Sequence, residues 1–211
     1  MRPHLVSRTS LFVGAIGALA AMAACSSDST SPARGTLAVQ LTDAPFSIDS
    51  LSSVDVFVVR VDGRLAAADS AAADSGATSD SAEAHGWKTL ASPNASVNLL
   101  AYQNGTVLGL GQADVAAGSY QGFRLVIDPS RSSVTLKSGL VLTGTSSPNI
   151  SFPSGSRSGL KINLSSPIVV AANDTTTMVV DFDVDNSFVL RGNSLSQNGL
   201  LFKPVIHASV K

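Results

Sequence analysis

Cysteine is almost absent from this chain of 211 residues, since Cys25 is its only one. A single cysteine excludes any disulfide within the chain, so the fold must be stabilised by its apolar core and by hydrogen bonds between strands. Charged residues make up only 14% of the chain and the formal net charge is −1, without a basic run. We therefore expect no nucleic-acid partner.

Long hydrophobic runs are also missing. The longest uncharged apolar stretch, Leu11 to Ala24, has 14 residues, whereas a membrane-spanning helix needs about 20. Its length, and the basic Arg2 and Arg8 before it, are typical of a signal peptide. We predict that residues 1–24 form a lipoprotein signal peptide that is cleaved before Cys25.

The residues around this cleavage site favour attachment of a lipid. Small residues precede Cys25, and Met22 stands where the usual signal prefers Leu. The alternative is an ordinary secretory signal cut near Ala24, which would leave a free thiol. Acylation of Cys25 would remove the risk of unwanted disulfides in an oxidising compartment.

A lipid on Cys25 would make the membrane the first partner of this protein, because two or more acyl chains anchor stably. We expect a lipid-anchored protein of the cell envelope. Ser26, and not Asp, follows the cysteine. By resemblance to enterobacterial sorting, this favours the outer membrane over the inner one, if the host has two. Residues 25–35 read as a short, Ser-rich tether.

Helical periodicity is lacking as well, since no amphipathic pattern of three turns occurs after the signal. Residues 36–211 instead alternate apolar and polar side chains with the period of half-buried strands. About ten short strands predict an all-β sandwich with Greek-key-like, immunoglobulin- or prealbumin-like connections. Closure into a barrel is the alternative. Residues 65–86, rich in Ala, Asp and Ser, predict a low-complexity surface insertion between two strands.

Several local expectations follow from the strand pattern. The run from Val54 to Arg64 is apolar on both faces, which indicates a central strand. Asn104 and Gly105 predict a hairpin turn that joins a strand at residues 99–102 to a strand at residues 107–110. Residues 176–184 predict one long strand, and Pro204 indicates an edge or a bulge in the last strand.

Sequence motifs of known enzymes are absent, including those of serine hydrolases, zinc proteases and dinucleotide-binding folds. We therefore expect no enzymatic activity. The alternative is a hydrolase that uses pairs of Asp and His, which would require His207 within hydrogen-bond reach of a carboxylate in a cleft.

Three alternating acids form the sharpest local signal. On a strand, Asp181, Asp183 and Asp185 would line one face, where their like charges repel one another. A Ca²⁺ ion, which binds six to eight oxygen ligands, would neutralise them. Asp43, at the end of the first strand, is a further candidate ligand. No other cofactor is expected.

The structural alternative is a solvent-facing strand whose acids pair with Lys161, Arg191 or water. Asp43 likewise has a structural interpretation, because an Asp at a bend accepts hydrogen bonds from backbone N–H groups.

Exposed aromatic side chains with polar atoms are common in sugar-binding modules. Trp87 and Tyr102 are therefore candidate ligand-binding residues if they lie together in a groove. With only 5% aromatics in the chain, a role in the core is the competing interpretation.

The stretch Thr42-Asp43-Ala44-Pro45 ends the first predicted strand. It resembles the opening motif of the domain of unknown function 4382, a family of secreted or lipid-anchored proteins of bacteria and archaea. The later segments Val180 to Asp183 and Phe202 to Ile206 also resemble this family. The resemblance supports the β architecture over roughly residues 35–211 and implies no established activity.

Together these patterns predict a lipid-anchored cell-envelope β-sandwich that acts as a non-enzymatic binding or structural module. Its expected partners, besides the membrane, are a cell-surface polymer or an envelope protein. A carbohydrate- or surface-polymer-binding module and a hydrolase are the alternatives.

Overall fold

Strands make up almost all of the regular structure, as the alternation predicts. The computed structural model describes residues 32–44, 50–66, 86–152 and 158–211. The signal peptide, Cys25, the T-D-A-P proline and most of the predicted insertion lie outside these residues. Within the described part, residues 32–211 form one compact unit. None of its helices is long and apolar enough to cross a membrane.

Fifteen strands are present in the described residues, more than the roughly ten expected, because several are only two to four residues long. The strands are β1 (Arg34–Thr42), β2 (Leu51–Leu65), β3 (Lys88–Ala91), β4 (Ala95–Asn98), β5 (Leu108–Ala116), β6 (Gly118–Ile127), β7 (Ser133–Leu136), β8 (Val141–Thr143), β9 (Ile150–Ser151), β10 (Leu160–Leu164), β11 (Ile168–Val170), β12 (Thr175–Phe182), β13 (Phe188–Leu190), β14 (Leu200–Phe202) and β15 (Ile206–Val210). The helical turns are η2 (Leu99–Tyr102), η3 (Pro129–Arg131), α2 (Val184–Ser187) and α3 (Leu195–Asn198).

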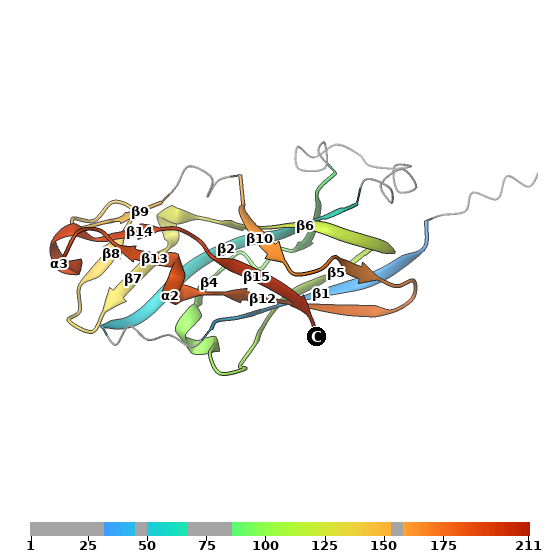
Figure 1. Cartoon of the computed structure of the whole chain (residues 1–211), viewed down its shortest axis with the longest axis horizontal. Helices are drawn as coiled ribbons and strands as arrows, with labels where there is room; N and C mark the ends of the chain where they lie inside the picture. Colours follow the sequence, from blue (N-terminus) through green and yellow to red (C-terminus); the bar gives the residue numbers. More distant parts are fainter. Residues whose placement is uncertain (1–31, 45–49, 67–85, 153–157) are drawn as a thin grey trace, which may run out of the picture. The chain divides into compact units, whose positions relative to one another are not determined.

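Two layers form the body of the sandwich, and both belong to one twelve-stranded sheet with the order β5-β1-β12-β15-β10-β6-β2-β7-β8. One layer holds β5, β1, β12 and β15, and the other holds β10, β6, β2, β7 and β8 (Figure 1). The short parallel pairing of β10 with β15 joins them. The sheet does not close on itself, so the all-β sandwich is confirmed.

β2 is the central strand of its layer, as its apolar character on both faces predicts. It pairs with β3 and β4 on one side and with β6 and β7 on the other. Strands β3 and β2, which flank the predicted insertion, are antiparallel neighbours.

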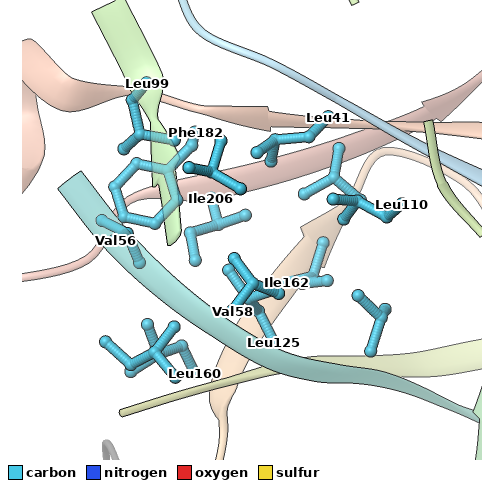
Figure 2. Close-up of a cluster of buried hydrophobic side chains, with 14 of the residues drawn as sticks. Leu41, Val56, Val58, Leu99, Leu110, Leu125, Leu160, Ile162, Phe182 and Ile206 are labelled. Atoms are coloured by element: carbon cyan, nitrogen blue, oxygen red, sulfur yellow. The ribbon is translucent and has the colours of Figure 1, made fainter. Parts of the chain in front are cut away.

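The core lies between the two layers. Figure 2 shows Leu41, Phe182 and Ile206 of one layer facing Val58 and Leu125 of the other. All five side chains are fully buried and belong to a single apolar cluster. Alternate residues of each strand supply this cluster, so the other alternate residues face outward. The outward-facing residues of β2, β6 and β10 form the site described below.

A second sheet of three strands, β13-β14-β9, packs at the end of this body. The last predicted strand is divided between the two sheets: β14 ends at Phe202, β15 begins at Ile206, and Pro204 lies in the break. A proline cannot donate a ladder hydrogen bond, which explains the break.

Two local predictions are wrong. Residues 99–102 form the 3₁₀ helix η2 and not a strand, because Asn98 caps its first N–H groups through a bond from Leu100 N of 3.2 Å. Asn104 and Gly105 do adopt the positive φ angles of a turn, 56° and 84°. β12 ends at Phe182, and the short helix α2 follows in place of further strand.

Candidate functional site

A row of charged side chains crosses the outer face of three neighbouring strands. The strand register places Asp62 of β2 opposite Arg124 of β6, and Arg124 opposite Lys161 of β10. On the other side of β2, Asp62 lies opposite Thr89 of β3. The row exists because charged residues occupy alternate positions of strands whose other positions enter the core.

Asp62 holds this row together. It is 0% exposed, and its carboxylate accepts bonds from Arg124 Nε at 2.8 Å, Arg60 Nε at 3.1 Å and Thr89 Oγ1 at 3.0 Å. A buried carboxylate needs this degree of satisfaction to remain stable in the fold. One negative charge is therefore shared between two guanidinium groups.

Trp87 lies above the next position of the same face. Gly122 of β6 is opposite Arg64 of β2, and the indole lies over this glycine, since a Cβ there would be 3.4 Å from Trp87 Cη2. The guanidinium carbons of Arg124 and Arg64 lie 4.5 Å and 5.2 Å from the ring centroid. These are cation–π distances, so the indole holds both arginines in place.

These side chains surround a pocket of about 420 Å³. Its lining consists of Arg64, Trp87, Gln121, Gly122, Phe123, Arg124, Ser158, Gly159, Lys161 and Ile162. Three of these residues are cationic and none is acidic. The pocket is therefore basic, although the chain as a whole has a net charge of −1.

A second group of titratable side chains lies at the C-terminal end of β1. Asp43 is only 2% exposed; its carboxylate accepts bonds from Gln103 Nε2 and from Val184 N, each of 3.1 Å. Burial, together with the nearby charges of Asp181 and Asp183, raises the pKa of Asp43 to about 6, although the two hydrogen bonds lower it. Asp43 thus joins the end of β1 to η2 and α2.

The shared strand face predicted for Asp181, Asp183 and Asp185 is wrong, because β12 ends before Asp183. Asp183 is the N-cap of α2, where its Oδ1 accepts a bond of 3.0 Å from Asn186 N. Asp185 lies in the first turn of that helix. Only Asp181 remains on the strand.

Asp181 and Asp183 nevertheless lie close enough to Asp43 to affect its charge, as the functional interpretation of Asp43 required. Burial and the charge of Asp183 raise the pKa of Asp181, while His207 and the N–H of Ala44 oppose this. Asp181 Oδ1 is buried and has no hydrogen-bond partner within the described ranges of the chain. Among the described residues, however, no group of three or more His, Cys, Asp or Glu side chains is placed to hold a metal ion.

His207 of β15 is the register partner of Asp181. Its side chain is exposed and does not line the pocket. Within the part of the chain that the structure describes, no hydrogen bond joins it to a carboxylate.

Trp87 and Tyr102 do not share a groove. Trp87 lines the basic pocket, whereas Tyr102 belongs to η2, packs against the core and accepts bonds from Thr42 Oγ1 and Asp43 N through its carbonyl oxygen. The first half of the T-D-A-P motif thus has a structural role, because both residues fasten β1 to η2.

The model of one protein family matches residues 34–204, most of the chain. It describes a domain of unknown function, DUF4382. The chain belongs to this family. No curated protein and no solved structure matches this DUF4382 chain.

The matched region of this DUF4382 domain includes the whole pocket, whose cationic residues the sequence interpretation missed. A signal for part of it was present: Arg60, Asp62 and Arg64 alternate with apolar residues within β2. Such alternation places all three charges on one face. Nothing local indicated that Arg124 and Lys161 would join them, because that depends on the register of three strands.

Proposed function

We propose that this protein is a lipid-anchored component of the cell envelope whose β-sandwich acts as a non-enzymatic binding or structural module. The observation that carries the proposal is Cys25, the only cysteine of the chain, placed directly after the apolar run of a signal peptide. The first described strand begins at Arg34, and we expect residues 25–35 to act as the tether between the lipid and the domain.

Mass spectrometry of the protein from its native membrane tests the anchor. We expect a mature N-terminus at Cys25 that carries a diacylglycerol thioether, and recovery of the protein in the membrane fraction. The Cys25→Ala variant should lose the lipid and keep residues 1–24. An unmodified Cys25 thiol on the mature wild-type protein would contradict the proposal.

The membrane is the second part of the proposal. If the host has two membranes, Ser26 favours the outer one. Separation of the two membranes by density gradient should place the wild-type protein in the outer membrane fraction, and the Ser26→Asp variant should shift toward the inner one. An inner-membrane wild type would contradict this assignment while leaving the anchor intact.

Binding of a carbohydrate or surface polymer is the alternative that a specific observation favours. Trp87 lines a pocket together with polar side chains, as in many small-molecule sites. The hydrolase alternative lacks such support, because His207 lies outside the pocket and no hydrogen bond within the described residues joins it to a carboxylate, although Asp181 is its register partner. Loss of a measured hydrolytic activity in His207→Ala would support it against a binding role.

A further inference from the structure

The outer face of β2, β6 and β10 carries more positive charge than its own carboxylate balances. Arg124 and Lys161 are direct cross-strand neighbours, and like charges in that position destabilise a sheet. Asp62 is shared between Arg60 and Arg124. In the described part of the chain, no carboxylate forms an ion pair with Arg64 or Lys161. An anionic ligand would compensate these charges.

The cationic groups are also held in fixed positions before any ligand arrives. The Nε atom of Arg124 is bound to Asp62, and its Nη1 donates to the carbonyl oxygen of Ser158 at 3.2 Å. Trp87 packs against the guanidinium groups of Arg124 and Arg64. Side chains that are already ordered lose little entropy on binding, which favours affinity.

Trp87 acts here differently from a sugar-stacking platform. Two guanidinium groups already lie over its ring, so we assign it the role of a positioning residue. Charge, and not stacking on a free aromatic face, should then dominate recognition in this pocket.

The volume of the pocket favours a ligand larger than a simple ion. Its volume of about 420 Å³ lies within the range of pockets for small organic molecules, about 300–1,000 Å³. Gln121 and Ser158 add polar groups to the lining, and Phe123 and Ile162 add apolar surface. Hydroxyl groups and a ring can therefore be accommodated beside the anionic group.

We propose that this pocket binds an acidic sugar unit, a saccharide whose carboxylate is bound by Arg64, Arg124 and Lys161. Arginine suits this chemistry because its planar fork matches the two oxygens of a carboxylate. The proposal rests on the binding role proposed above and specifies its ligand, but it does not depend on the lipid anchor.

Trp87 is the only tryptophan of the chain, so its fluorescence reports directly on the pocket. The probe is trigalacturonate, titrated into residues 25–211 carrying Cys25→Ser, and cellotriose is the matched neutral probe. We expect a saturable fluorescence change with trigalacturonate, weakened by salt as expected for an ionic contact, and none with cellotriose.

Two charge reversals provide matched variants. Lys161 is exposed in the pocket, whereas Lys203 is exposed beyond β14 and outside it. Lys161→Glu should weaken trigalacturonate binding by about tenfold or more, because it puts a carboxylate against the ligand. Lys203→Glu changes the net charge equally and should bind as the wild type does.

Three results of the sugar titrations would overturn the proposal: equal binding of cellotriose, equal weakening by both variants, or absence of any trigalacturonate binding. Inorganic phosphate is the last probe. If phosphate alone binds as tightly as trigalacturonate, the pocket is a simple anion site and the sugar assignment is wrong. None of these results bears on the lipid at Cys25, which mass spectrometry decides separately.

Discussion

Asp43 shows how one side chain can connect three elements and make the fold sensitive to pH. Its carboxylate is bound to the N–H of Val184 and to Gln103, and burial raises its pKa from 3.8 to about 6. The folded chain therefore holds a proton on Asp43 more tightly than the unfolded chain does. The resulting stabilisation is complete below pH 3.8 and is lost as the pH rises past about 6.

Asp43→Asn should remove this part of the pH dependence, because an amide cannot ionise but still accepts a bond from Val184 N. Between pH 4 and pH 7 the wild type should lose stability relative to the variant by about 3 kcal/mol at most, since one pKa unit corresponds to about 1.4 kcal/mol. Urea unfolding across this range measures the difference. The exposed Asp174→Asn is the matched control. Parallel pH profiles for Asp43→Asn and wild type would contradict the prediction.

Asp62 is also a buried carboxylate, but it differs from Asp43 in the charges that surround it. Three donors satisfy it, two of them cationic, whereas Asp43 has two uncharged donors and two acidic neighbours. Cationic partners thus surround the carboxylate that organises the basic pocket, whereas uncharged donors and acidic neighbours surround Asp43.

At the scale of elements, α2 interrupts what the sequence pattern predicted as continuous strand. Asp183 accepts bonds from both the backbone and the side chain of Asn186. Such an N-cap stabilises the first turn of a helix, and here it turns the chain from β12 toward the second sheet.

Asp183→Ala should lower the free energy of unfolding by about 1 kcal/mol, because the cap is lost. Asp183→Asn keeps an oxygen for the cap but removes the charge that disfavours ionisation of Asp43 and Asp181. Comparing the two variants by urea unfolding therefore isolates the cap from the repulsion. Equal stability of both variants would show that the cap contributes nothing.

The acids at the end of β12 illustrate why the sequence prediction of the candidate metal site was incomplete. Alternation of Asp181, Asp183 and Asp185 indicates a strand, but Asp183 followed by Asn186 three positions later equally fits a helix cap. The local sequence pattern cannot distinguish a continuing strand from a helix cap. The end of β12 depends on its pairing with β15: the last residue of β12, Phe182, pairs with the first residue of β15, Ile206.

Turn chemistry, in contrast, could be predicted wherever a single residue decides it. Pro204, expected at an edge or a bulge, lies in the break between β14 and β15, and Asn104 and Gly105 adopt the positive φ of a turn. The hairpin around that turn was wrong, because Asn98 provides a cap that starts η2. Only the part of the basic pocket on β2 could be predicted, since Arg64 meets Arg124 and Lys161 through the register of β2, β6 and β10.

At the scale of the whole molecule, the two layers depend on each other. Among the described residues, only two pairs of β10 and β15 connect the layers within the sheet, so the shared apolar core must supply most of the contact between the layers. The pocket lies on the outside of one layer, and its geometry should therefore persist only while the other layer stays packed against the core.

Phe182→Leu tests this dependence from the opposite layer. Phe182 of β12 is 0% exposed and stacks on Phe202, with ring centroids 6.1 Å apart. Loss of this packing should destabilise the protein by about 1–2 kcal/mol. Because the core is shared, the unfolding transitions followed by Trp87 fluorescence and by circular dichroism should move together to lower urea. Val169→Ala, at a side chain 63% exposed, should move neither. A Trp87 transition that stays in place while circular dichroism shifts would show that the layer carrying the pocket unfolds on its own, and the basic site would then be stable without its partner layer.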